Sequence, residues 1–170
     1  MQQQQQERRH VIAVLVDNEP GVLARVIGLF SGRGYNIECL TVAEVDPGGQ
    51  LSRINIVTAG TDSIVDQIKA QLDRLVPVHS VVDLTDDGPS VERELVLLKV
   101  ASTGDARIEA LRIADIFRAR VIDSTLESFV FETTGSSQKI NALIELMKPL
   151  GLAEVSRTGV VAIARGAEGM

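Results

Sequence analysis

One order of strands and helices occurs twice along this chain, and that repeat limits the possible folds more than any other feature. In each half an apolar strand leads into an amphipathic helix, two further strands form a hairpin, and a second amphipathic helix leads into a last strand. A polar stretch without periodicity, residues 85–90, separates the halves. Each half has about 75 residues, and the two sequences are too different to indicate a duplication.

Hydrophobic spacing predicts the elements of the first half. They are strand 10–16, helix 21–32, strands 37–45 and 51–58, helix 61–75 and strand 78–84. The first helix has one apolar face with spacings of three, four and seven, formed by Val22, Leu23, Val26, Ile27, Leu29 and Phe30. The cluster Asp46-Pro47-Gly48-Gly49 predicts the hairpin turn.

The second half follows the same order. Its predicted elements are strand 94–101, helix 105–117, strands 120–125 and 128–133, helix 136–147, and strand material over 153–164 that Thr158-Gly159 interrupts. The apolar residues expected along helix 105–117 are Ile108, Leu111, Ile116 and Phe117. The fold class is therefore α+β, with two ferredoxin-like βαββαβ modules.

Four segments are predicted along the chain. They are a disordered tail at 1–8, which holds the run Gln2–Gln6, a first domain at 9–86, a linker at 87–92 and a second domain at 93–166. Because domains this small are marginally stable alone, we expect stabilisation by association.

Composition argues against several classes of partner. The formal charge is −6 and aromatic residues make up 3% of the chain, so an RNA-binding ferredoxin-like module is disfavoured. The single cysteine, Cys39, excludes an internal disulfide. No apolar run approaches the roughly 20 residues of a membrane span, and no signal-peptide core is present, so a cytoplasmic location is expected.

The turn before the first helix has the properties of an anion site. Pro20 suits a first helical turn, Asn18 or Glu19 can cap the helix, and Gly21 lets a ligand approach the main chain. Unpaired N–H groups at a helix start attract carboxylates and phosphates. Ordinary capping explains the same residues equally well, so both interpretations stay open.

The residue pattern gives little evidence for a catalytic site or a metal site. His10 and His79 begin predicted strands with no nucleophile nearby, so structural or solvent-facing roles are expected for both. Cys39 is expected as a small buried thiol. The pair Asp86-Asp87 lies in the linker without any ligand spacing. We therefore assign no catalytic residue and no metal ligand.

Two longer motifs carry a resemblance to a known family. Asp17-Asn18-Glu19-Pro20-Gly21-Val22-Leu23-Ala24-Arg25-Val26, continued by Arg33-Gly34-Tyr35-Asn36-Ile37-Glu38, resembles the regulatory (small) subunits of acetolactate synthase, also called acetohydroxyacid synthase. The first motif alone resembles ACT domains generally. Val91-Glu92-Arg93-Glu94-Leu95 and Arg157-Thr158-Gly159-Val160-Val161 extend the similarity into the second half.

The resemblance implies a regulatory subunit without an active site or cofactor of its own. Such subunits bind and activate the catalytic subunit, which carries thiamine diphosphate, Mg and FAD, and confer feedback inhibition by valine or another branched-chain amino acid. It further implies a homodimer through the ACT domains, with the effector bound between two chains. The implied effector residues are Asn18, Glu19, Gly21, Val22 and Leu23 of one chain, with Asn36 and Ile37 of the other. A free-standing ACT-type amino-acid sensor with another partner is the alternative.

Overall fold

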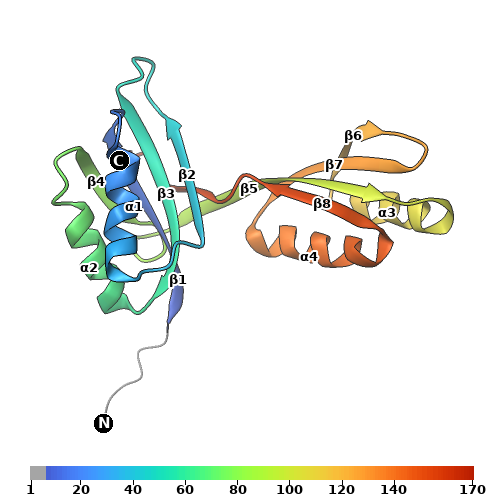
Figure 1. The fold of residues 1–170 in the computed structure, drawn as a ribbon, viewed down its shortest axis with the longest axis horizontal. Coiled ribbons are helices and arrows are strands. Elements are labelled where there is room, and N and C mark those ends of the chain that lie inside the picture. Colours follow the sequence, from blue (N-terminus) through green and yellow to red (C-terminus); the bar gives the residue numbers. More distant parts are fainter. Residues whose placement is uncertain (1–6) are drawn as a thin grey trace, which may run out of the picture. The chain divides into compact units, whose positions relative to one another are not determined.

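The structure, a computed structural model, describes residues 7–170. Its elements are β1 (Arg8–Asp17), α1 (Val22–Arg33), β2 (Cys39–Glu44), β3 (Leu51–Gly60), α2 (Asp62–Leu72), β4 (Val78–Asp83), β5 (Ser90–Ala101), α3 (Gly104–Ile116), β6 (Arg120–Ser124), β7 (Ser128–Gly135), α4 (Ser137–Met147), the 3-10 turn η1 (Lys148–Leu150), β8 (Leu152–Arg157) and β9 (Val161–Ala164) (Figure 1). The order βαββαβ occurs twice, which confirms the predicted fold class. The run Gln2–Gln6 of the expected tail lies outside the described residues, whereas Arg8, also placed in that tail, is the first residue of β1.

The first sheet has the strand order β2-β3-β1-β4, with antiparallel neighbours throughout. Alternate residues of β1 point to opposite faces, as a strand requires. Ile12, Val14 and Val16 face α1 and α2, and the core between helices and sheet is completed by Val22, Val26, Phe30, Ile54, Ile56, Val65, Ile68 and Leu72. Both helices lie on one face of this sheet (Figure 1).

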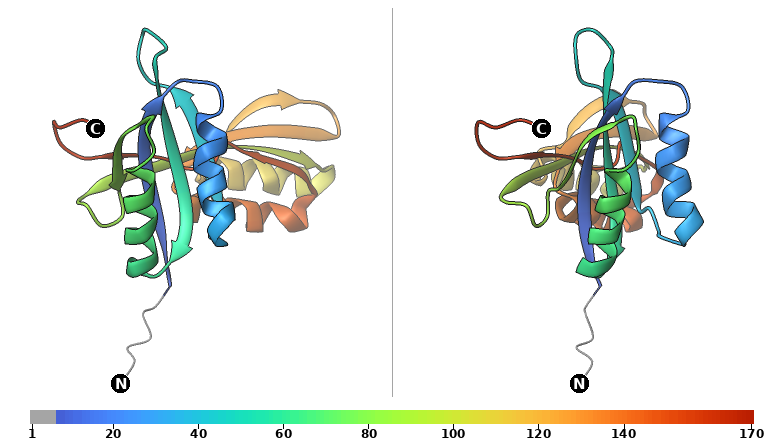
Figure 2. Two further views of the ribbon diagram at one scale, coloured as in Figure 1. Left: turned by 60° about the vertical axis from the view of Figure 1, so that its left-hand side comes forward. Right: turned by 90° about the vertical axis from the view of Figure 1, so that its left-hand side faces the viewer.

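The other face of the first sheet is covered by the end of the chain. Val160 and Ala162 pack on Val11, Ala13 and Val57 in a second buried cluster. The Arg53 guanidinium donates to the carbonyl oxygen of Ala162 at 2.8 Å, which fixes the segment to β3. In Figure 2 this red segment and α1 lie on opposite sides of the sheet.

Two compact units follow from these contacts. One contains the chain up to Val91 together with Val160–Met170, and the other contains Glu92–Gly159. The sequence pattern predicts residues 160–166 in the second domain, but in the structure they pack with the first. β5 also begins at Ser90, inside the linker expected at 87–92. The difference has a physical cause, because the apolar face of β1 needs a cover that residues 9–86 do not supply.

Replacing Val160 with aspartate is expected to destabilise the first unit strongly. Val160 is 5% exposed, so the carboxylate of the new aspartate would be buried without a partner, at a cost of several kcal/mol. Val161→Asp is the matched control, because Val161 is the next residue and is 49% exposed. Thermal unfolding should show a melting temperature lower by more than about 5 °C for Val160→Asp only. Equal melting of the two variants would contradict this packing.

The second unit holds the strands β6-β7-β5-β8 in that order, with α3 and α4 on one face (Figure 1). Its core contains Val96, Leu98, Val100, Ala110, Ile113, Ala114, Phe129, Phe131, Ile140, Leu143 and Met147. The predicted apolar residues of α3 are buried only in part: Phe117 packs against the core, whereas Ile108 is 67% exposed and Ile116 is 63% exposed. The residues that α3 buries are Ala110, Ile113 and Ala114.

None of the helices within the described residues is long and apolar enough to cross a membrane.

Candidate functional site

The start of α1 carries main-chain donors that the helix itself does not use. Gly21 is the N-cap residue, with φ 87°, and no side chain caps the helix. The N–H of Val22 donates to Glu19 at 3.3 Å, and the first helical bond runs from Arg25 to Gly21 at 3.1 Å. The N–H groups of Leu23 and Ala24 lie between them and have no acceptor within the helix.

Glu19 accepts the N–H of Val22 through its main-chain carbonyl, but no side chain of the described residues caps the helix, and that of Asn18 is engaged elsewhere. The side-chain amide of Asn18 donates to Glu44 Oε1 at 2.9 Å and to the carbonyl oxygen of Gly49 at 2.8 Å. Its main-chain N–H donates to the carbonyl of Gln50 at 2.7 Å. Asn18 thus ties the turn before α1 to the β2–β3 hairpin, and its side-chain carbonyl oxygen is the polar atom left to face a ligand.

Asp46 stabilises the turn of the β2–β3 hairpin, to which Asn18 is hydrogen-bonded. Its carboxylate accepts the N–H of Leu51 at 2.7 Å, and this hydrogen bond lowers the pKa of Asp46. Because the folded-state pKa is lowered, the contribution of this bond to stability is present at neutral pH and is lost as the pH falls through the folded pKa. The turn is therefore fixed at neutral pH.

The side chains along α1 separate into a buried and an exposed set. Val22, Val26 and Phe30 are buried in the core, so a ligand can meet only the main chain of Val22. Leu23 is 38% exposed and lies beside Gly21, where it offers an apolar surface. Ala24, whose N–H is one of the free donors, was not among the expected site residues, although its position in the first turn indicates it.

The other predicted site residues lie past the far end of α1. Gly34 ends the helix with φ 71°, and the exposed Asn36 follows, its carbonyl oxygen accepting the hydroxyl of Thr58 at 2.6 Å. Ile37 is half-buried and packs against the core. Since α1 has 12 residues, the two groups are separated by about 18 Å along its axis. One chain does not bring them together.

The histidines and the cysteine have partners within the first unit. His79 Nε2 lies 2.6 Å from Asp17 Oδ1 at the surface. Cys39 is half-buried, not fully buried, and its Sγ accepts the N–H of Val160 at 3.2 Å. His10 is completely buried beside Asp83, in a group of acidic residues that no sequence spacing indicates.

Comparisons with known proteins cover both units. Residues 12–80 match the family described as the AHAS small subunit-like ACT domain, and residues 93–166 match the family described as the small subunit of acetolactate synthase. A solved structure, that of the acetolactate synthase small subunit from Thermotoga maritima, is similar with a TM-score of 0.85 and 37% identity. It covers 95% of this chain and 99% of its own.

Curated relatives agree over nearly the whole length. The acetolactate synthase small subunit of Aquifex aeolicus is 49% identical over 94% of this chain and 83% of its own length. That of Mycolicibacterium smegmatis is 40% identical over 95% of this chain and 94% of its own. With both halves matched and identity this high, the chain belongs to the family of acetolactate synthase small subunits, regulatory proteins that contain an ACT domain and carry no cofactor of their own.

Proposed function

We propose that this chain binds the catalytic subunit of a cytoplasmic acetolactate synthase, raises its activity, and makes it sensitive to valine or another branched-chain amino acid. The observation that carries the proposal is the exposed start of α1, where Gly21 has φ 87° and no side chain of the described residues caps the helix. Such a helix start stabilises a carboxylate.

The groups at the two ends of α1 match the three parts of a branched-chain amino acid. The N–H groups of Leu23 and Ala24 suit its carboxylate, and the side-chain oxygens of Asn18 and Asn36 suit its ammonium group. Leu23 and Ile37 supply an apolar wall for the branched side chain. Each end alone supplies only part of this set, so a complete site needs two chains.

The topology of the first sheet supports a homodimer that would complete the site. β2 is an edge strand and runs parallel to β1, whereas α1 runs back between them, so the start of α1 lies at the end of β2. Asn36 and Ile37 precede the start of β2. Antiparallel pairing of β2 with β2 of a second copy would therefore place Asn36 and Ile37 of one chain beside Gly21 of the other.

Inhibition then follows from differential binding. We call the residues Asn18–Leu23 of one chain and Asn36 with Ile37 of the other the two effector half-sites. An effector that bridges two ACT domains stabilises the dimer arrangement in which both half-sites meet. A catalytic partner that is less active in that arrangement is then inhibited. A coupling free energy of about 1–3 kcal/mol between effector and catalytic subunit changes the affinity for either one several-fold to a hundred-fold.

Reconstitution tests this proposal. The chain is mixed with its cognate catalytic subunit, and acetolactate formation is measured with and without valine, leucine and isoleucine. We expect the chain to raise the activity and at least one of these amino acids to lower it again. If calorimetry detects amino-acid binding but the chain leaves the activity unchanged, it is a free-standing sensor and the proposal is wrong.

A further inference from the structure

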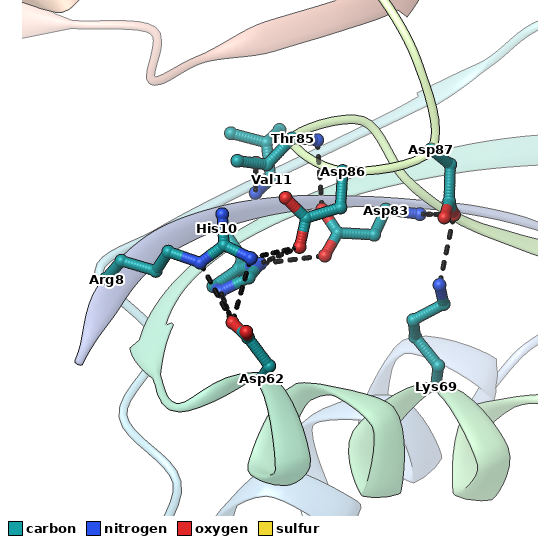
Figure 3. Close-up of polar contacts among 9 residues, drawn as sticks. All are labelled: Arg8, His10, Val11, Asp62, Lys69, Asp83, Thr85, Asp86 and Asp87. Atoms are coloured by element: carbon teal, nitrogen blue, oxygen red, sulfur yellow. Dashed lines mark hydrogen bonds and ion pairs between the residues drawn. The ribbon is translucent and has the colours of Figure 1, made fainter. Parts of the chain in front are cut away.

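A buried histidine and three aspartates meet beside the start of β1, outside the effector half-sites. His10 comes from β1, Asp62 is the first residue of α2, Asp83 ends β4, and Asp86 lies in the turn that follows. Figure 3 shows these carboxylates around the His10 ring, with Arg8 across the opening. We call this group the His10 cluster.

One nitrogen of His10 is fixed by a buried carboxylate. The side chain of His10 is 0% exposed, and its Nδ1 lies 2.7 Å from Asp83 Oδ2. The other oxygen of Asp83 accepts the N–H of Thr85 at 2.9 Å, so the carboxylate is held in place. Because a carboxylate accepts, Nδ1 carries a proton, and in the neutral ring Nε2 then presents a lone pair. A carboxylate behind a histidine is the arrangement that orients metal-binding imidazoles.

The lone pair of Nε2 has no hydrogen-bond donor among the described residues, although the atom is buried. Nε2 lies 3.8 Å from Asp62 Oδ1, which is also an acceptor. Two acceptors that face each other repel unless a cation or a proton lies between them. Arg8 neutralises Asp62 and Asp86, whereas Nε2 of His10 itself is left without a donor in the part of the chain that the structure describes.

The spacing of the side chains suits a metal ion. One ligand atom from each of His10, Asp62 and Asp86 lies within 4.8 Å of the others. Asp62 Oδ1 lies 3.8 Å from Nε2 of His10, and Asp86 Oδ2 lies 3.8 Å from Nδ1. Zinc bonds of about 2.0–2.2 Å in a tetrahedral shell hold ligand atoms about 3.4 Å apart. The side chains of Asp62 and Asp86 are 61% and 36% exposed, so they are free to move the small distance required. One imidazole with two carboxylates suits Zn²⁺ or Mn²⁺ and leaves a coordination position open.

Arg8 holds a positive charge where the ion would bind. One guanidinium nitrogen of Arg8 lies 2.8 Å from Asp62 Oδ1 and 2.5 Å from Asp86 Oδ2, so it bridges both carboxylates. The side chain of Arg8 is 45% exposed and can turn outward into solvent. The carboxylates of Asp62 and Asp86 thus already bind a cationic group, and Arg8 would compete with a metal ion for them.

We propose that His10, Asp62 and Asp86 form a binding site for a divalent transition-metal ion of the zinc type, with Asp83 orienting His10 and Arg8 competing with the ion. Bound there, the ion would join the first residues of β1 to the start of α2 and to the turn after β4. This would stabilise the first unit, since the unfolded chain does not hold the ligands together. The site shares no residue with the effector half-sites.

Metal titration of the full chain tests the proposal, with ZnCl₂ as the calorimetric probe and CoCl₂ as the spectroscopic probe. The metal-free chain should bind one equivalent and melt at a higher temperature with metal than with a chelator. Asp62→Asn and Asp86→Asn should each weaken binding at least tenfold, and Asp83→Asn about tenfold. Arg8→Ala should bind at least tenfold more tightly, because the competing charge is gone.

Two controls separate this site from unspecific binding. Asp66→Asn removes an exposed carboxylate one turn further along α2, and His79→Ala removes the other histidine, so neither should change metal affinity. His10 itself is left intact, because it is buried in the fold. The proposal is wrong if the chain binds no metal, if Asp62→Asn and Asp86→Asn bind as the parent does, or if Arg8→Ala binds no more tightly.

Discussion

Replacing Gly21 with aspartate is expected to weaken inhibition by valine strongly while activation of the catalytic subunit persists. The new carboxylate would lie at the helix start and take the N–H groups that a valine carboxylate needs. Repulsion between the aspartate carboxylate and the carboxylate of valine should weaken valine binding tenfold to a hundred-fold, or by about 1.4–2.8 kcal/mol. The measurement is the valine concentration that halves the activity of the reconstituted enzyme.

The fold should tolerate this change, which keeps the test interpretable. A Cβ on Gly21 meets no atom within 4 Å, and aspartate accepts positive φ better than most residues. Gly21→Asn is the matched control, because it has nearly the same shape and the same backbone requirement but no charge. We expect it to lose far less valine sensitivity than Gly21→Asp. If a folded Gly21→Asp variant kept full sensitivity, the half-site would lie elsewhere.

Local sequence signals were sufficient for the fold class. The buried residues of α1 are Val22, Val26 and Phe30, which belong to the predicted apolar face. The hairpin turn forms where Asp46-Pro47-Gly48-Gly49 indicates it, between β2 and β3. Spacing and turn chemistry act over a few residues, so they can be read without knowledge of distant contacts.

Periodicity did not decide which side of α3 is buried. Ile108, Leu111 and Ile116 have helical spacing, but Ala110, Ile113 and Ala114 have it as well. The larger side chains favour burial of Ile108, Leu111 and Ile116. Packing of the helix on the sheet favours burial of Ala110, Ile113 and Ala114, which lie in the core. Both sets satisfy the same pattern, and only the tertiary contact of the helix decides between them.

Contacts between distant residues were not predictable from the sequence. The Val160 N–H meets Cys39 across 121 positions, and His10 meets Asp83 across 73. No spacing rule connects such residues, because the order of strands in the sheet brings them together. The full set of effector residues is implied by short motifs shared with a known family, and both the set and its meeting across two chains stay proposals.

Replacing Gly151 with alanine is expected to unfold the second unit or come close to it. Gly151 follows η1 with φ 96°, and a Cβ there would lie 2.1 Å from the carbonyl oxygen of Ala101, a backbone atom that cannot move aside freely. The carbonyl of Gly151 accepts the N–H of Ala101 at 2.8 Å, so the close approach is part of the pairing at the end of β5. We expect a loss of more than about 4 kcal/mol.

Gly104→Ala separates this clash from the cost of positive φ alone. Gly104 belongs to the same unit and has φ 57°, but a Cβ there meets nothing within 4 Å. Its replacement should cost only about 1 kcal/mol, the usual penalty for alanine in the left-handed region. Thermal and urea unfolding of both variants give the comparison. Since a clash with backbone cannot be relieved by a side-chain rotation, a Gly151→Ala variant as stable as Gly104→Ala would mean that η1 and β5 do not approach as described.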